Sequence, residues 1–110
     1  MNTLVFRIRQ RYYDQIVAGT KTVEYRRDVP FWQVRIGNID TKDAIRFANA
    51  IVFNDPTEVT AVFICGKRSH RRQVTRIERI KTPDYSSEQG KKDVNTPACF
   101  GFHLGLEVKP

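Results

Sequence analysis

A change of hydrophobic period at Gly19 constrains the fold of this chain more than any other feature. Apolar residues recur at helical spacing in residues 10–18, which predicts a short amphipathic helix. Gly19 stands where a left-handed residue commonly ends a helix. Beyond it the period becomes two, so Val23 and Tyr25 share one face of a predicted strand, where we expect them to pack. The chain therefore passes from helix to strand within a few residues.

Other segments alternate in the same way and are predicted to be strands. They are residues 4–9, 32–36, 59–65, 71–80 and 99–108. Residues 71–80 would return antiparallel to residues 59–65, and a bulge near Thr75 and Arg76 would restore their alternation.

Two regions fit the alternating pattern less well. Residues 41–53 fit either a helix capped by Thr41 or a strand, and we favour a helix followed by an extended piece. Residues 81–97 are polar and rich in turn formers, which predicts a long loop or lid. With about five or six mixed or antiparallel strands and one or two short helices, residues 1–110 are predicted to form a single α+β domain built on a small β-barrel or curled sheet.

The charge of the chain is strongly unbalanced, with 19 Lys and Arg residues against 12 Asp and Glu residues and a formal net charge of +7. Such an excess favours an anionic partner, most often nucleic acid or a nucleotide, with a solvated basic surface as the alternative. No apolar run approaches the roughly 20 residues of a membrane-spanning helix. The first apolar stretch contains Arg7, unlike a signal peptide. We therefore expect a cytoplasmic protein that is monomeric by default and has no membrane contact.

The two cysteines, Cys65 and Cys99, are too few for a disulfide framework, and we expect both to be reduced core residues. Each has a histidine near it in the sequence, but the spacing lacks the pattern of a structural zinc site. We expect neither a metal site nor a cofactor, since the sequence contains no phosphate-binding or dinucleotide-binding glycine motif.

A carboxylate between two cations lies on the polar face of the strand predicted after Gly19. Strand geometry places Glu24 and Arg26 about 7 Å apart, and Lys21 precedes them directly. A carboxylate in this setting can orient water or act as a base, and a guanidinium suits phosphate or carboxylate. We predict a pocket in which Lys21, Glu24 and Arg26 perform the chemistry, with a structural ion-pair network as the alternative.

A second cationic cluster, residues 67–72, lies at the tip of the hairpin predicted between residues 59–65 and 71–80. We call it the basic hairpin; it suits contact with a phosphate backbone, or simply exposure to solvent. For base stacking, Tyr25 and Trp32 are the candidates, with core packing as the alternative for Trp32. The residues predicted to bind nucleic acid or substrate are Thr22, Tyr25, Arg27, Trp32, Lys67, Arg68, His70, Arg71 and Arg72.

A strand, a short helix and then the pattern G-x-K-x-x-E-x-R on the next strand resembles the ASCH domain, a family of PUA-like barrels. Gly19, Lys21, Glu24 and Arg26 complete this pattern here. Two further stretches are similar to the general run of the family, residues 61–66 and 100–105. The resemblance implies a PUA-like barrel with an RNA- or nucleoside-related role.

One branch of that family is similar to small amidohydrolases that remove the acetyl group from N4-acetylcytidine. In that branch a lysine at the position of Lys21 and a threonine at the position of Glu24 carry catalysis, together with a more distant glutamate. This chain keeps the lysine and has a carboxylate in place of the hydroxyl. Thr20 and Thr22 are nearby hydroxyls at other positions, and Glu88 is the candidate for the distant glutamate.

The resemblance thus implies an RNA- or nucleoside-binding domain that hydrolyses an amide on an N4-acylated cytidine. The alternative is a non-catalytic RNA-binding or regulatory module that uses the same pocket together with the basic hairpin. The sequence leaves the choice between enzyme and binding module open, because the same three residues serve both.

Overall fold

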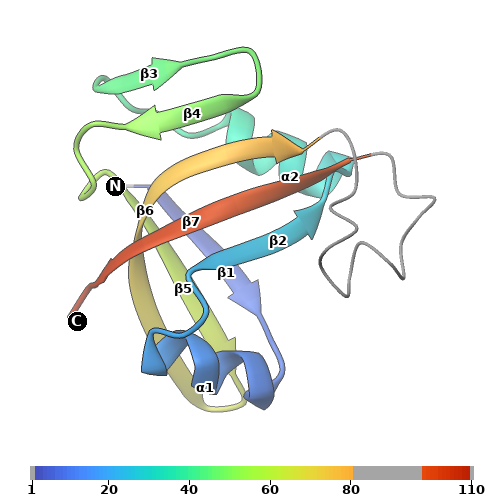
Figure 1. Cartoon of the computed structure of the whole chain (residues 1–110), viewed down its shortest axis with the longest axis vertical. Helices are drawn as coiled ribbons and strands as arrows, with labels where there is room; N and C mark the ends of the chain where they lie inside the picture. Colours follow the sequence, from blue (N-terminus) through green and yellow to red (C-terminus); the bar gives the residue numbers. More distant parts are fainter. Residues whose placement is uncertain (1, 81–97, 110) are drawn as a thin grey trace.

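The computed structural model describes residues 2–80 and 98–109 and shows a curled, mixed sheet with two short helices (Figure 1). The elements are, in chain order, β1 (Asn2–Arg7), α1 (Gln10–Ala18), β2 (Val23–Arg27), α2 (Pro30–Gly37), β3 (Ala44–Arg46), β4 (Ala50–Phe53), β5 (Val59–Cys65), β6 (Arg68–Ile80) and β7 (Cys99–Glu107). This half-barrel confirms the predicted α+β class, with seven strands in the described part of the chain where five or six were predicted.

Strand β6 organises the sheet because it pairs with three neighbours. Its first half pairs antiparallel with β5, which pairs in parallel with β1. Its second half pairs with β4, while β7 pairs along its other edge and then with β2. Strands β1 and β2 are therefore two ends of the curled sheet, and within the described residues they are not paired with each other. We call the gap between these two strands the seam.

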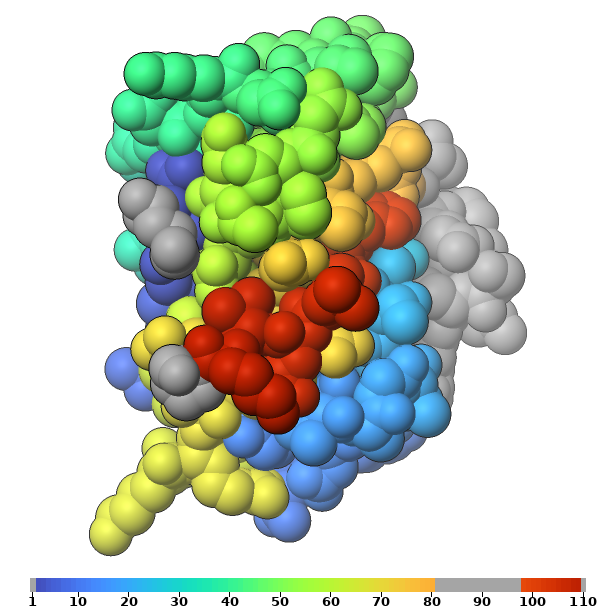
Figure 2. All heavy atoms as spheres, turned by 90° about the vertical axis from the view of Figure 1, so that its left-hand side faces the viewer, coloured from blue at the N-terminus to red at the C-terminus, as the bar shows by residue number. Residues whose placement is uncertain are grey.

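A bulge lets the long strand β6 serve both halves of the sheet. The register between β6 and β7 shifts between Arg72 and Val74 and again between Val74 and Arg76, which confirms the bulge predicted in this region. Bulges bend and twist a strand, and Figure 1 shows β6 curving around the molecule. Figure 2 shows the β3–β4 hairpin, in green, at one end and the β5–β6 turn, in yellow, projecting at the other.

The core lies inside the curl and consists largely of aromatic rings. Phe6 stacks on Trp32, with 4.8 Å between ring centroids, and on Phe63, with 5.1 Å. Phe102 meets Phe6 edge-on at 5.0 Å. Because Trp32 belongs to α2 and the fully buried Ile16 belongs to α1, both helices close the curl by packing an apolar residue into it.

Helix α1 occupies the predicted range and ends as the glycine indicates. Gly19 is left-handed, with φ of 79°. The Thr20 and Lys21 N–H groups both donate to the carbonyl of Gln15, at 3.0 and 3.1 Å. These bonds satisfy a carbonyl that the end of the helix would otherwise leave without a partner. The turn directs the chain into β2.

The strand predicted over residues 32–36 is wrong, because these residues belong to helix α2. Three alternating apolar residues fit a strand, but two of them, Trp32 and Ile36, are also four residues apart and share one helical face. Pro30 occupies the first turn of α2, where its missing N–H has no consequence. The proline therefore starts a helix as well as ending the preceding strand.

The helix favoured at the start of residues 41–53 is also wrong, and the strand alternative is correct. The segment forms a hairpin in which Ile45 of β3 faces Val52 of β4. β-branched residues at these positions favour the strand, and pairing of β4 with β6 joins the hairpin to the sheet.

Three other expectations concern single features of the chain. Cys65 and Cys99 are free thiols that are only partly buried. None of the described helices is long and apolar enough to cross a membrane. The loop or lid predicted for residues 81–97, with Glu88 in it, lies outside the described residues.

Candidate functional site

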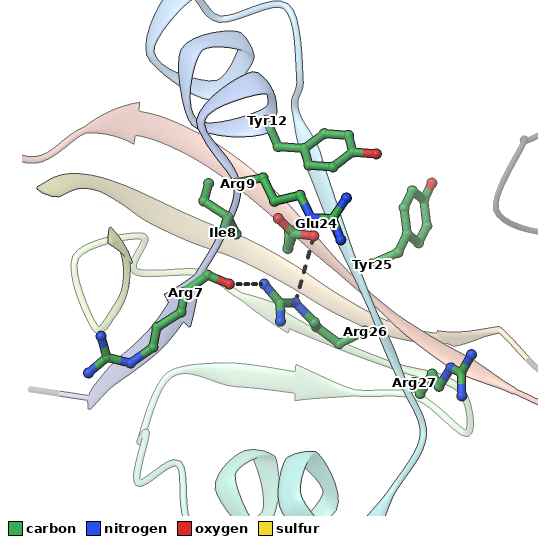
Figure 3. A pocket seen from close by; sticks show the side chains of 8 residues that line it. All are labelled: Arg7, Ile8, Arg9, Tyr12, Glu24, Tyr25, Arg26 and Arg27. Atoms are coloured by element: carbon green, nitrogen blue, oxygen red, sulfur yellow. Dashed lines mark hydrogen bonds and ion pairs between the residues drawn. The ribbon is translucent and has the colours of Figure 1, made fainter. Parts of the chain in front are cut away.

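A cleft of about 290 Å³ lies on the seam of the half-barrel (Figure 3). Its volume is close to the lower limit, roughly 300 Å³, of pockets that take small molecules. It is lined by Arg7, Ile8, Arg9, Tyr12, Glu24, Tyr25, Arg26 and Arg27. The first three residues end β1 and lead to α1, and the last four belong to β2. The cleft therefore opens where no described strand pairs with both β1 and β2 to close the sheet.

Glu24 is the buried acidic group of this cleft. Its neighbour across the sheet is Phe102, and the residue is only 7% exposed. Within the described residues its Oε2 atom is buried and has no hydrogen-bond partner. Burial raises the pKa of the Glu24 carboxyl above its ordinary value, and the charges of Lys21 and Arg26 and a hydrogen bond from the Tyr25 backbone offset this only in part.

Arg26 spans the seam beside Glu24. Its Nε atom lies 3.7 Å from Oε1 of Glu24, an ion pair too long for a hydrogen bond. At its other end the guanidinium donates to the carbonyl oxygen of Arg7 at 3.3 Å (Figure 3). It also lies 5.3 Å from the ring centroid of Phe6 and 5.7 Å from that of Trp32. Arg26 thus joins β2 to β1 and covers the aromatic core, while leaving one oxygen of Glu24 without a partner.

The geometry bears on the alternative of a purely structural ion-pair network. Buried carboxylates in such networks normally have their lone pairs satisfied, because an unpaired buried charge is costly. Besides a hydrogen bond from the Tyr25 backbone, Glu24 has a long ion pair with Arg26, and its Oε2 atom has no partner among the residues that the structure describes. This favours a carboxylate whose remaining hydrogen-bond acceptor is satisfied by a ligand in the cleft.

Cations and tyrosines surround the cleft mouth. The exposed arginines Arg7 and Arg9 stand on the β1 side and Arg27 stands on the β2 side. Tyr12 projects from α1, and Tyr25 lies at the β2 edge (Figure 3). A ligand that enters this site meets positive charge and aromatic surface around the carboxylate of Glu24.

Lys21 and Thr22 lie beside the cleft rather than in its lining. The Lys21 ammonium is 5.5 Å from the centroid of the Tyr12 ring, and its charge acts on Glu24. Thr22 is exposed, and its backbone carbonyl accepts a hydrogen bond from Leu104 at 2.8 Å. The structure therefore places Glu24 and Arg26 in the lining of the cleft and Lys21 beside it.

Tyr25 and Trp32 have different surroundings. Tyr25 lies on the opposite face of β2 from Glu24, where its ring is next to the Cα atom of Gly101. Trp32 is 6% exposed and packs against Phe6 and Phe102, so the core alternative describes it. Of the two aromatic candidates for stacking, only Tyr25 borders the cleft.

The basic hairpin is anchored to helix α1 through Arg68. The Arg68 guanidinium pairs with Asp14 at 3.6 Å and lies 4.7 Å from the Tyr13 ring centroid. Lys67 and Arg71 are exposed. None of the residues of the basic hairpin lines the cleft.

Two residues of the basic hairpin are turned inward. His70 is 8% exposed, and its Nδ1 atom lies 3.9 Å from the carboxylate of Glu107. Burial lowers the pKa of His70, Glu107 opposes that shift, and Arg72 and Lys109 add to it. Within the described residues, His70 Nε2 and Arg72 Nε are buried without hydrogen-bond partners. The His70 ring and the Arg72 Nε atom therefore point into the fold and are not presented on its surface.

Sequence reasoning missed Arg7, Arg9 and Tyr12 as cleft residues. The arginines were predicted only as part of the strand over residues 4–9, and Tyr12 only as part of the helix over residues 10–18. The available signal was the proximity of two alternating arginines to a tyrosine-rich helix start. It gains meaning only once β1 and β2 are known to face each other across the seam.

No protein family, curated protein or solved structure matches this chain. The resemblance of residues 19–26 to the ASCH pattern stays a prediction. Among the described residues, no group of three or more His, Cys, Asp and Glu side chains is arranged to hold a metal ion.

Proposed function

We propose that this chain binds RNA through the seam cleft, where one nucleotide places its base against Glu24 and its phosphate against the surrounding arginines. The observation that carries the proposal is the carboxylate of Glu24, which lines the cleft and is acceptor-only when ionised. Its Oε2 atom is buried and has no hydrogen-bond partner among the described residues. The complementary ligand group is an N–H donor. The exocyclic amino group of cytosine, adenine or guanine supplies such a donor. The N3–H of uracil is flanked by two carbonyl oxygens, which a carboxylate repels, so uracil is the poorer partner.

The rest of the lining supports a nucleotide more than a simple amine. Guanidinium groups bind phosphate through paired donors, and Arg7, Arg9 and Arg27 stand around the mouth. Tyr12 and Tyr25 offer aromatic surface of the kind on which unpaired bases stack. A net charge of +7 draws a polyanion to the molecule as a whole.

Calorimetric titration with cytidine and uridine monophosphates tests this assignment. A hydrogen bond to an ionised group is worth about 1.5–3 kcal/mol. We therefore expect cytidine monophosphate to bind about 10- to 100-fold more tightly than uridine monophosphate. Glu24→Gln should abolish most of that preference. Glu78→Gln, which makes the same change at an outer-face carboxylate paired with His103, should keep it. Equal affinities of wild type for the two nucleotides would contradict the assignment.

A second candidate function is hydrolysis of an amide on an N4-acylated cytidine at the same site. It is favoured by the combination of a buried carboxyl of raised pKa and a lysine acting on it. In this reaction Glu24 removes a proton from water as the water attacks the amide carbonyl, while Lys21 stabilises the developing oxyanion. Cleavage of the carbon–nitrogen bond transfers the proton to the amine and yields cytidine and a carboxylic acid.

Incubation of the protein with N4-acetylcytidine, followed by chromatography of the products, decides whether the protein is an enzyme or a binding module. The enzymatic version predicts release of cytidine and acetate by wild type, loss of release in Lys21→Ala, and normal release in Lys67→Ala, which changes an exposed lysine of the basic hairpin. Absence of turnover in wild type would reject hydrolysis of this substrate and leave nucleotide binding as the function.

A further inference from the structure

Helix α2 carries an exposed aromatic ring with an arginine held flat against it. Phe31 is 52% exposed. The Arg35 guanidinium carbon lies 3.3 Å from the Phe31 ring centroid, and the same guanidinium donates to the Phe31 carbonyl at 3.0 Å. The hydrogen bond and the stacked contact together fix the plane of the guanidinium. A fixed guanidinium plane, like an aromatic ring, is a surface on which an unpaired base stacks.

This pair is connected to the cleft by successive ring contacts. The Arg26 guanidinium, which lines the cleft, lies 5.7 Å from the Trp32 ring centroid. The centroid of Trp32 is 5.2 Å from that of Phe31. The Phe31–Arg35 pair is therefore two contacts away from the residue that spans the seam. Because Trp32 is buried, a strand that joins the two positions passes over the surface beside it.

The chemistry of both positions selects an unpaired strand. Glu24 is buried, so a base must present its edge inside the cleft. In an RNA duplex the Watson–Crick edges are already paired, and the major groove is too deep and narrow to offer the other edges. Cations accompany aromatic surface at both positions, Arg7 and Arg9 at the cleft and Arg35 on α2. This is the combination that single-stranded nucleic acid sites use.

We propose that the cleft and the Phe31–Arg35 pair are two positions of one track for single-stranded RNA, with a second base stacked on Arg35 beside the nucleotide held by Glu24. The proposal rests on the proposed function, because it extends the nucleotide site to a polynucleotide. The track differs from the nucleotide site because it requires at least two linked nucleotides, whereas a monomeric nucleotide fills only the first position.

A length series tests the track. Fluorescence anisotropy would compare cytidine monophosphate, as a competitor, with a labelled oligocytidylate of about four nucleotides, the smallest site of comparable single-strand binders. We expect the oligonucleotide to bind at least about 5-fold more tightly, the effect of one added stacked base. A blunt RNA duplex should bind more weakly than the single strand.

Substitutions at Arg35 locate the second base. Arg35→Lys keeps the charge and removes the planar surface, so we expect it to abolish the gain from length and leave monophosphate binding unchanged. Arg46→Lys, the same change at an exposed arginine of β3, should leave both affinities as in wild type. Phe31→Tyr should keep the gain, and unchanged thermal unfolding of each variant would exclude a folding defect.

The outcomes test the track separately from the proposed nucleotide site. If the monophosphate binds in a Glu24-dependent manner and the oligonucleotide gains nothing, or if the gain survives Arg35→Lys, the track is wrong and the nucleotide site stands. If the duplex binds as tightly as the single strand, the track is likewise wrong. If neither the monophosphate nor the oligonucleotide binds, the proposed function itself is wrong.

Discussion

The side chain of Glu24 combines features that rarely occur together in a residue that only stabilises a fold. It is 7% exposed, one carboxylate oxygen has no partner among the described residues, and its ion pair with Arg26 is 3.7 Å long. Residues that violate local rules for stability are concentrated at functional sites. We therefore expect that Glu24 lowers the free energy of unfolding and that its role lies in the cleft.

The pH dependence of stability reveals this penalty. Burial raises the pKa of folded Glu24 above 4.5. Between the ordinary and the raised pKa, the folded chain holds a proton that the unfolded chain has released. The contribution of Glu24 to the free energy of unfolding therefore falls as pH rises through that interval, and it stays lower above it.

Glu24→Gln removes the buried charge, so we expect it to be more stable than wild type at about pH 7, on the order of 1 kcal/mol. The advantage should disappear at about pH 4, where wild-type Glu24 is protonated. Thermal unfolding followed by circular dichroism at the two pH values measures both effects. A variant less stable than wild type at neutral pH would instead show that the Glu24–Arg26 ion pair is structural.

Among the elements, the junction of α1 and β2 sets the position of the chemical residues. Gly19 adopts φ of 79°, and nothing lies within 4 Å of the position that a Cβ atom would occupy. The requirement for glycine is therefore one of backbone conformation and not of space. A left-handed conformation costs an ordinary residue roughly 1–2 kcal/mol.

Gly19→Ala should accordingly destabilise the fold by about 1 kcal/mol. Gly37→Ala is the matched control, because Gly37 also has open space around its Cα atom but no positive φ. In helix α2 that alanine should be neutral or slightly stabilising. Urea unfolding of the two variants provides the comparison, and equal destabilisation would contradict the role given to the left-handed turn.

The same elements show what sequence can predict here. Helix α1, its glycine end and the bulge in β6 follow from local period and local backbone preference, and these were predicted. The structures of residues 32–36 and 41–53 were predicted wrongly, because their few apolar residues fit both the helical and the strand period. Packing against Phe6 selects the helix in the first segment, and pairing with β6 selects the strands in the second.

The candidate site was predictable to a similar degree. Alternation indicated that Glu24 and Arg26 belong together, since it places them on a shared face, and Lys21 joined them because it directly precedes that strand. It could not indicate that the face with Glu24 is the buried one, or that Arg7 and Arg9 stand opposite. Both facts depend on the curl that brings β1 and β2 to the same seam.

At the scale of the whole molecule, positive charge is distributed over both ends as well as the cleft. Arg46 lies on β3 and Lys67 lies in the β5–β6 turn, at opposite ends of the molecule (Figure 1). A net charge of +7 therefore attracts RNA without indicating where it binds. The salt dependence of single variants separates local phosphate contacts from this general attraction, because each contact contributes its own counterion release.

For single-stranded RNA each phosphate contact adds about −0.7 to the slope of log affinity against log salt concentration, so three or four contacts at the cleft predict a slope of about −2 to −3. Arg9→Gln should make the slope less steep by about 0.7. Arg46→Gln removes the same charge at the β3 end and should leave the slope unchanged. Anisotropy titrations with the four-nucleotide oligocytidylate over a range of potassium chloride concentrations measure all three slopes. If both variants changed the slope equally, the attraction would be diffuse, and the arginines of the cleft would not be the phosphate contacts.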